Sequence, residues 1–538
     1  MRLYLRFRFL SNPSLPKLSW VASIARHGET VSVHHGRFVE VRDHFFIEGV
    51  WNGPFDKGDF ARTDCVFGTG AILRNRSVLF VSSASTTDYL YYHQTAEYVV
   101  VSNSLPLLLS YTEDSLDPHF SGYPAINDSI IEGINDYIRD IPTLKGSVKR
   151  LMYRNLEISA RSVNETEKDM PANFTCYNDY YSYLVGNYRL IVDNVRDPNR
   201  KFRIQIFSTQ SKGYDSTASN AIAAKFGIDK VFTITKGKSP KHFATRDQNT
   251  QVDDDGKAIC DSLGLNSVPI DRRSFTREFE QEYLYYAVLD NNQDANFNEI
   301  MKYVSDVSVI LTGTLGEMWY TAQCCKDRPG YINSELKRWD HGGHGLSEIR
   351  LVVGFIHLPL PYIGARRREE IFRITESPEM GPWRLENSYD RPIPRRIAEE
   401  AGVPRDLFGQ IKVGSVVLFP RPSLPYGKEL REEFLESLVN EGVMTRWATK
   451  LWPLVHFVNT VTAFRYNYRA VYYLERLISK IIGRDFVFDL LMWKHLDGSL
   501  FCFCVNKCVH NYASCFREKA CITSDRLSRQ VNSIGCHN

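Results

Sequence analysis

Six residues between a strand-like run and a helix-like run carry the groups that could do chemistry. The turn 211–216, SKGYDS, follows an apolar run at 202–207 and leads into a segment of small residues that extends to 226. A strand, a polar turn and a helix in this order present backbone N–H groups and a helix N-terminus to a phosphate. The two hydroxyls and the carboxylate of the turn can hydrogen-bond pyrophosphate and hold a cation beside it. The turn therefore predicts a nucleoside triphosphate site, and the alternative is a structural junction capped by Ser216.

The glycine spacing of this turn excludes two common nucleotide loops. The Walker loop needs Gly, four residues and Gly-Lys-Ser/Thr, and the dinucleotide fingerprint needs three spaced glycines. The pattern S-x-G-x-D-S instead resembles the S-G-G-x-D-S pyrophosphate loop of the N-type ATP pyrophosphatases, the superfamily of asparagine synthetase, with Lys212 replacing a glycine. The resemblance implies that Asp215 helps hold Mg²⁺ and that ATP is bound by Ser211, Lys212, Gly213, Asp215, Ser216 and Thr217.

The elements predicted around the turn alternate between strands and helices. Strands are expected at 202–207, 230–235, 267–270 and 307–312, and helices at 216–226, 256–263 and 276–289. This order is typical of a doubly wound parallel sheet, in which ligands bind at the carboxyl ends of the strands. A helix is expected at 177–195 from apolar and aromatic residues at three- and four-residue steps. We expect this ATP pyrophosphatase domain to cover 175–495, with a mostly helical part from 345 onward.

Short strand-like runs separated by turn residues fill the first 120 residues and predict an antiparallel sheet domain. The order of elements in 78–109, with LYY at 90–92, resembles the amidotransferase domain of asparagine synthetases. The resemblance implies an Ntn-type β-sandwich with helices over 1–170. Glutamine-hydrolysing members use a cysteine that follows the initiator Met, whereas this sequence has Arg2 there and its first cysteine is Cys65. We therefore expect a domain of that shape without glutaminase activity.

A second loop, TGTLGE at 312–317, follows the strand expected at 307–312. It resembles the family's S-G-E-G-x-D-E segment. The resemblance implies that Gly313 contacts ATP and that Glu317 shares Mg²⁺ with Asp215. The alternative is that Glu317 lies in the first turn of the next helix, where its charge suits the helix dipole.

Two later segments match the same family in the same order. Glu348-Ile349-Arg350 resembles the E-x-R motif whose glutamate faces the acyl-adenylate, and residues 391–412 resemble a helix that ends in a catalytic lysine. The resemblance implies catalytic roles for Glu348 and for Lys412, the latter stabilising negative charge on the leaving pyrophosphate. The alternatives are an ion pair of Glu348 with Arg350 or Arg368 and a solvent-exposed Lys412.

Three other groups of polar residues receive simpler interpretations. Asp253-Asp254-Asp255 precedes a predicted helix and is expected to cap it. His341 and His344, in the DHGGHG turn, are expected to lie in a mobile loop. The six cysteines after residue 500 lack paired C-x-x-C spacing, so a zinc site is an open alternative and 496–538 is expected to be a non-globular tail.

The composition limits the classes of function. The 538 residues are 43% hydrophobic and 24% charged with a net charge of +3, which is typical of a globular protein and too mild to predict nucleic acid or a membrane surface as partner. No run approaches the roughly 18 to 20 apolar residues of a membrane span. We expect a cytoplasmic protein, and a homodimer stays open.

The resemblance as a whole implies an ATP-dependent amide-forming ligase that uses ATP and Mg²⁺. It would activate a small-molecule carboxylate as an acyl-adenylate, release pyrophosphate, and transfer the acyl group to ammonia or a substrate amine. Two alternatives are a non-catalytic asparagine-synthetase-like binding protein and a tRNA-modifying ATP pyrophosphatase, for which Cys324-Cys325 would supply a reactive thiol.

Overall fold

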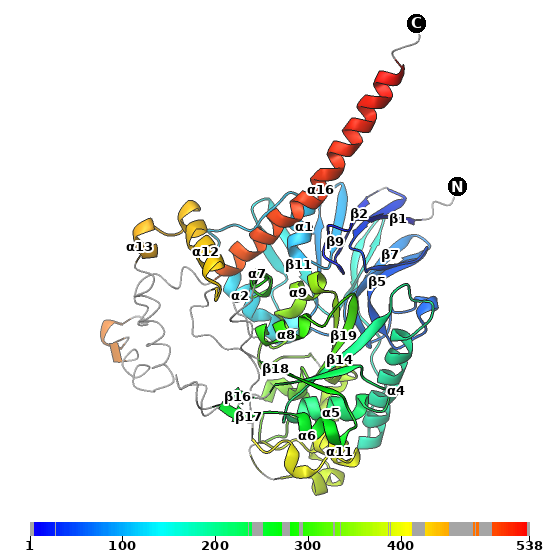
Figure 1. Ribbon diagram of the computed structural model, residues 1–538, viewed down its shortest axis with the longest axis vertical. Helices are drawn as coiled ribbons and strands as arrows, with labels where there is room; N and C mark the ends of the chain where they lie inside the picture. The colour runs from blue at the N-terminus through cyan, green and yellow to red at the C-terminus, as the bar shows by residue number, and fades with distance from the viewer. Residues whose placement is uncertain are drawn as a thin grey trace.

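A computed structural model describes residues 5–534 except 27, 235, 239–250, 272–279, 290–293, 326–328, 334, 386, 388, 412–424, 451–476, 479 and 484–497. Of residues 236–238, 251–252 and 517–534 only the backbone is described. The chain forms a mixed α/β structure in which two largely antiparallel sheets come first and a parallel sheet follows (Figure 1).

The N-terminal part consists of two sheets. The seven-stranded sheet has the order β1 (Arg6–Ser11), β3 (Thr30–His35), β2 (Trp20–Ala25), β9 (Tyr98–Ser102), β8 (Leu90–Gln94), β11 (Gly146–Leu151) and β10 (Asp140–Thr143). The six-stranded sheet has the order β13 (Val163–Thr166), β12 (Asn155–Ser159), β7 (Ser77–Val81), β6 (Val66–Arg74), β5 (Phe45–Trp51) and β4 (Glu40–Val41). Apart from the parallel pair β1–β3, the neighbours are antiparallel, so the expected antiparallel sheet domain is confirmed.

Apolar side chains from alternate strand positions fill the space between these two sheets. Trp20 of β2 contacts Phe46 of β5, with ring centroids 5.0 Å apart, and stacks on Phe80 of β7 at 5.8 Å. Its indole N–H also donates a hydrogen bond to the Thr69 hydroxyl of β6. Because strand side chains alternate between the two faces of a sheet, each sheet buries one face in this layer.

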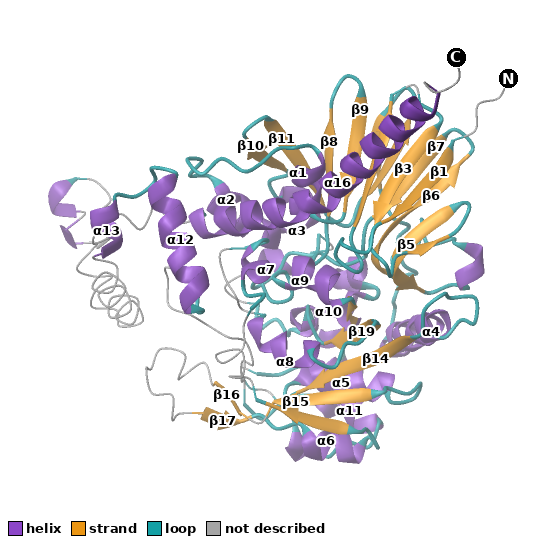
Figure 2. Ribbon diagram, turned by 45° about the horizontal axis from the view of Figure 1, so that its top comes forward, coloured by secondary structure: helices purple, strands orange, loops and turns teal. Residues whose placement is uncertain are grey.

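The parallel sheet has the order β18 (Ser267–Ile270), β15 (Lys230–Ile234), β14 (Ile204–Gln210), β19 (Val307–Thr312) and β20 (Phe355–Pro359), and every neighbouring pair is parallel. A small hairpin of β16 (Lys236–Lys238) and β17 (Gln251–Asp253) lies beside it (Figure 2). The expected parallel sheet is confirmed, and β18 and β19 have the predicted bounds. β14 lies closer to the turn than predicted, because Phe207–Gln210 pairs with β15.

Helices cover both faces of the parallel sheet. Adjacent residues of a strand point to opposite faces, and here they pack against different sets of helices. Ile206 and Val309 belong to one buried cluster together with α4, α5 and α11, whereas Phe207 and Ile310 belong to another with α7, α8 and α9. The bounds of these helices are α4 (Tyr177–Val195), α5 (Tyr214–Ala223), α7 (Tyr283–Tyr286), α8 (Asn298–Met301), α9 (Leu346–Val353) and α11 (Pro392–Glu400). The remaining helices are α1 (Leu105–Tyr111), α2 (Tyr123–Asp128), α3 (Gly133–Asp136), α6 (Lys257–Ser262), α10 (Arg368–Glu376), α12 (Lys428–Asn440), α13 (Arg446–Lys450) and α16 (Ser499–Ile534).

Three predictions about helices hold and two need correction. α4 has the predicted bounds, and α6 lies within the predicted helix 256–263. α5 begins two residues before the predicted helix and ends three residues before its predicted end. Within the predicted helix 276–289 the described residues are helical only at α7, and 272–279 lie outside the described residues. The part after 345 also contains the strand β20, whose five buried residues pair with β19.

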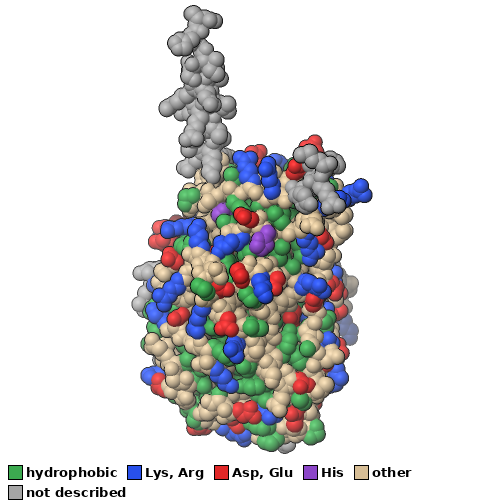
Figure 3. All heavy atoms as spheres, turned by 90° about the vertical axis from the view of Figure 1, so that its right-hand side faces the viewer, with side chains coloured by type: hydrophobic (Ala, Val, Ile, Leu, Met, Phe, Trp, Pro, Cys, Tyr) green, Lys and Arg blue, Asp and Glu red, His purple; other side chains and the backbone are tan. Residues whose placement is uncertain are grey.

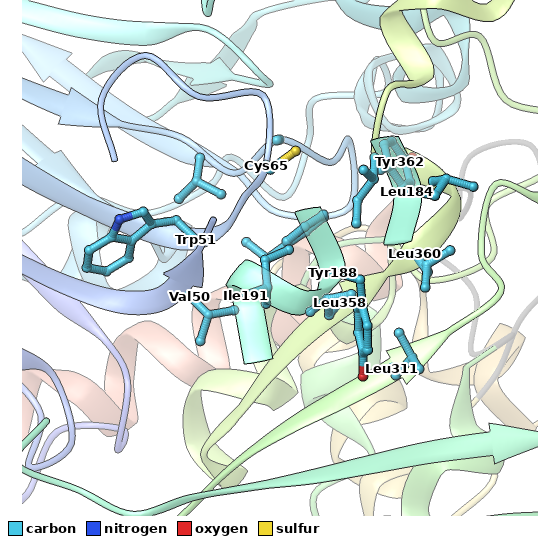
Figure 4. Packing of buried hydrophobic residues seen from close by; sticks show 14 of the residues in the cluster. Val50, Trp51, Cys65, Leu184, Tyr188, Ile191, Leu311, Leu358, Leu360 and Tyr362 are labelled. Atoms are coloured by element: carbon cyan, nitrogen blue, oxygen red, sulfur yellow. The ribbon is translucent and has the colours of Figure 1, made fainter. Parts of the chain in front are cut away.

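One hydrophobic cluster joins the N-terminal sheets to the parallel sheet. Figure 4 shows Val50 and Trp51 of β5 beside Ile191 of α4, and Tyr188 of the same helix beside Leu358 of β20 and Leu311 of β19. All of these side chains are buried. The strand ends of the parallel sheet are therefore held in place by packing from both parts of the chain.

The C-terminal segment departs from the expected non-globular tail. Helix α16 packs along α1 (Figure 2). Its buried side chains include Phe501, Val505, Cys508 and Cys515. Cysteine behaves as a small apolar residue when buried, so the cysteines of α16 continue its apolar face. Among the described residues no cluster of His, Cys, Asp or Glu could hold a metal ion, so the zinc alternative finds no support there.

Charged side chains of both signs are interspersed on the face shown in Figure 3. This mixed surface agrees with the small net charge of the sequence. Among the helices described, none combines the length and the apolar character that crossing a membrane requires.

Candidate nucleotide site

The candidate phosphate loop lies at the topological switch point of the parallel sheet. Strands β15 and β18 continue from β14 on one side, whereas β19 and β20 lie on the other side. The connections after β14 and β19 therefore lie next to each other at the carboxyl edge, where ligands of open α/β sheets bind. A Cβ on Gly313 would lie 2.6 Å from the backbone carbonyl carbon of Asp215, so the loops are in direct contact.

The serine hydroxyls of the loop make hydrogen bonds within the loop. The Ser211 N–H donates to Ser216 Oγ at 3.2 Å, and the Gly213 N–H donates to Ser211 Oγ at 3.1 Å. The buried Thr217 hydroxyl donates to the Gly213 carbonyl at 2.7 Å. Ser211, Ser216 and Thr217 thus hold the turn in shape. The expected capping by Ser216 needs correction, because α5 begins at Tyr214 with Gly213 as its N-cap and Ser216 lies inside the helix. The ATP contacts implied by the resemblance stay a prediction.

Lys212 connects the loop to the acidic segment before α6. Its ammonium forms an ion pair with Asp253, and its N–H donates to Asp254 Oδ1 at 3.0 Å. Its carbonyl accepts a hydrogen bond from the Gly409 N–H at 2.8 Å. Asp255, one residue before the N-cap Gly256, accepts the Lys257 N–H at the start of α6, which agrees with a capping role. The other two aspartates contact Lys212 of the 211–216 loop instead.

Asp215 forms an ion pair with Arg391, which precedes the first turn of α11. The guanidinium of Arg391 is almost fully buried and lies 4.3 Å from the ring centroid of Tyr320. A Cβ on Gly316 would lie 2.0 Å from Asp215 Cγ, so the carboxylate lies against the second loop. Asp215 is therefore placed at the contact of the two loops, but it already carries a cationic partner.

Glu317 lies in the short 3-10 helix Gly316–Trp319 and also has an arginine partner. Its Oε1 accepts a hydrogen bond from Arg338 Nε at 2.7 Å and one from the Trp339 N–H at 3.2 Å. Burial raises the pKa of Glu317, but the Arg338 guanidinium outweighs burial and lowers the pKa to about 2. Glu317 is therefore ionised, and its position at the start of a helical turn agrees with the alternative given above.

This arrangement does not fit the Mg²⁺ site that the resemblance implies. A hard cation needs several oxygen ligands with free lone pairs. Asp215 and Glu317 each hold a guanidinium instead, and no group of three or more candidate ligands occurs in the described parts of the chain. A Mg²⁺ ion would have to compete with a guanidinium at each carboxylate.

Glu348 is buried at the junction of three parts of the chain. It lies on α9 and accepts hydrogen bonds from Ser104 Oγ, at the start of α1, and from the Tyr512 hydroxyl of α16, both at 2.9 Å. Burial raises the pKa of Glu348 to about 7. The two side chains that donate to Glu348 come from helices α1 and α16 and not from either loop at the strand ends.

Arg350 does not supply the ion pair considered for Glu348. Its guanidinium contacts Glu48 of β5, with Nη1 2.7 Å from Oε2, and Asp88, with Nε 2.6 Å from Oδ1. All three side chains are buried. This triad ties α9 to the N-terminal sheets, so both Glu348 and Arg350 of the E-x-R segment make buried polar contacts with the N-terminal part of the chain.

The histidine-containing turn is packed and does not agree with the expected mobile loop. His344 is buried, and its Nδ1 lies 2.6 Å from the Tyr89 hydroxyl. The carboxylate of Asp294 accepts hydrogen bonds from the Gly343 and Gly345 N–H groups. Burial lowers the pKa of His344 well below its usual value, so this imidazole is neutral.

The remaining two predictions concern Lys412 and the Cys324-Cys325 pair. Lys412 lies outside the described residues. Cys325 is buried, and burial raises the pKa of its thiol, which disfavours the thiolate that a thiol-transfer reaction would need.

The two arginine partners of the carboxylates are the residues that sequence reasoning missed. Arg391 stood at the start of the segment RPIPRR, and Arg338 belongs to no motif of the resemblance. A buried arginine has no sequence signal of its own, because its partner is defined by the fold.

A scan against protein-family models finds no match for this chain, and a search of curated proteins finds none either.

Proposed function

We propose that this chain binds the phosphate groups of ATP or of pyrophosphate as a non-catalytic relative of the asparagine-synthetase-type ATP pyrophosphatases. The observation that supports this proposal is the meeting of the Ser211–Ser216 and Thr312–Glu317 loops at the switch point of a parallel sheet. In this proposal the N-terminal sheets are an Ntn-type sandwich, and the parallel sheet is an ATP pyrophosphatase domain.

Among the described residues, the side chains that the resemblance assigns to Mg²⁺ (Asp215 and Glu317) and to catalysis (Glu348) support binding without acyl transfer. Asp215 and Glu317 hold arginines, and Glu348 holds the hydroxyls of Ser104 and Tyr512. General acid–base or metal-assisted chemistry needs groups that can reach the reacting atoms. Since these three carboxylates already have partners inside the protein, we infer that the fold is kept for ligand binding.

Isothermal calorimetry with inorganic pyrophosphate and with ATP tests the binding proposal. We expect binding by the wild-type protein and at least tenfold weaker binding by the Ser211→Ala/Ser216→Ala variant. Ser262→Ala, which removes an exposed hydroxyl on α6, is the matched control and should bind as the wild type does. The absence of binding to both ligands would refute the proposal.

The second candidate is the amide-forming ligase with a small carboxylate and an amine as substrates. The contact between the two loops favours it, because the resemblance places ATP between these segments. Exchange of labelled pyrophosphate into ATP, measured across a panel of carboxylates, separates the two candidates. Exchange that depends on a carboxylate and is abolished by Asp215→Ala would favour the ligase, whereas pyrophosphate binding without exchange would favour the non-catalytic protein.

A further inference from the structure

Each of the two carboxylates expected to hold Mg²⁺ has a buried arginine as its partner. The side chains of Arg391 and Arg338 are both only 2% exposed. Arg391 contacts Asp215, and Arg338 contacts Glu317. Arginine stays protonated even when buried, so these two positive charges are permanent.

The net charge of these four groups equals that of a metal-loaded site. Two carboxylates carry a charge of −2, and one Mg²⁺ would bring the sum to zero. Two guanidinium groups bring it to zero as well. Without such compensation the carboxylates would repel a polyphosphate, because charges of the same sign interact strongly in a partly buried site. The chain therefore supplies internally the charge that a metal ion would supply.

Several further contacts fix the arginines in these positions. Arg338 Nη2 donates to the Gly342 carbonyl at 3.1 Å, and its Nη1 donates to the Tyr362 hydroxyl at 3.3 Å. Arg391 lies over the ring of Tyr320. Separating such a guanidinium from its carboxylate is costly, because the other contacts would keep the cation buried without its counter-ion.

We infer that this site takes its phosphate ligand without a divalent cation, and that Arg391 and Arg338 replace Mg²⁺ as fixed counter-ions. The ligand class is a metal-free polyphosphate, such as pyrophosphate or the phosphate chain of a nucleoside triphosphate. The identity of this ligand rests on the proposed function, whereas the absence of metal binding at Asp215 and Glu317 does not.

Binding of Mn²⁺ alone, followed by electron paramagnetic resonance, tests the metal part of the inference. At millimolar Mn²⁺, the wild-type protein should show no bound Mn²⁺ that is lost in the Asp215→Asn variant. The Arg391→Met/Arg338→Met variant exposes both carboxylates and should bind Mn²⁺ at least tenfold more tightly than the wild type. Arg396→Met, on the helix α11 that follows Arg391 but paired with Glu400, is the control and should show no gain.

The wild-type measurements remain decisive if the double variant fails to fold. Wild-type Mn²⁺ binding that is lost in the nearly isosteric Asp215→Asn variant would overturn the inference. Arg391→Lys, which keeps the charge, should not gain Mn²⁺ affinity, and a tenfold gain would also overturn it.

Calorimetry with inorganic pyrophosphate tests the ligand part. We expect the Kd measured in EDTA and the Kd measured in Mg²⁺ to agree within twofold. Binding that is at least tenfold tighter in Mg²⁺ would overturn the inference while leaving the proposed function intact. Absence of pyrophosphate binding in both buffers would refute the proposed function, and the Mn²⁺ result would still decide the metal part.

Discussion

Replacing Glu348 by Gln should stabilise the protein at alkaline pH and leave its stability almost unchanged at acidic pH. Glu348 is buried and accepts hydrogen bonds from Ser104 and Tyr512, and a glutamine carbonyl can accept the same two bonds. The other charged or titratable groups that interact with it are Tyr91 on β8, Tyr283 on α7, Arg350 on α9 and Cys508 on α16. The substitution therefore removes the charge and keeps the geometry.

The expected magnitude follows from the pKa of Glu348. Burial raises this pKa from 4.5 to about 7, which corresponds to roughly 3 kcal/mol of the free energy of unfolding. Because the pKa of Glu348 is higher in the folded state than in the unfolded state, protonation of Glu348 favours folding. This contribution to the free energy of unfolding is complete below pH 4.5 and is lost as the pH rises through 7. The glutamine variant has no such loss. Its advantage over the wild type should grow from near zero at pH 4.5 to about 3 kcal/mol at pH 8.

Urea denaturation at pH 5, 6, 7 and 8 measures this difference, with tryptophan fluorescence as the probe. Glu436→Gln, which changes an exposed glutamate on α12, should show no pH-dependent difference from the wild type. Tyr512→Phe removes one of the two donors to Glu348 and should destabilise the wild type by about 1–2 kcal/mol. A difference between Glu348→Gln and wild type that stays constant from pH 5 to 8 would refute the reasoning.

Two further predictions concern the contacts of the 211–216 loop with its surroundings. Gly316→Ala places a Cβ 2.0 Å from the carboxyl carbon of Asp215, so we expect a loss of about 1–3 kcal/mol in urea denaturation. Gly381→Ala meets no atom within 4 Å and should lack this overpacking penalty, and an equal loss in both variants would contradict the steric explanation. Asp253→Asn weakens the ion pair with Lys212 and should tighten pyrophosphate binding by up to about fivefold in calorimetry, whereas weaker binding would show that this pair helps to hold the ligand.

The sequence was sufficient for the elements whose patterns are strong. The apolar runs of β18 and β19 and the three- and four-residue spacing of α4 each predicted an element with the observed bounds. β20 was missed, because its run FIHLP is short and lies in a part of the chain expected to be helical. The position of the 211–216 loop at a strand end was predictable from the order of strand, turn and helix.

The partners of the site residues were not predictable from the sequence. Asp215 and Arg391 are 176 residues apart, and their contact depends on the packing of α11 against α5. The helix α16 was missed for another reason. Its apolar face is made largely of cysteines, which were treated as candidate metal ligands and not as apolar side chains.

The contact between α1 and α16 also constrains the order in which the protein folds during synthesis. The side-chain amide of Asn12 donates a hydrogen bond to the carbonyl of Cys515, across 503 residues of sequence. A ribosome releases the N-terminal sheets long before it releases residue 515, and domains generally fold as they emerge. The face of α1 that α16 covers therefore stays uncovered until residues 499–516 have been synthesised, so the core beside the N-terminal sheets is completed only after α16 has formed.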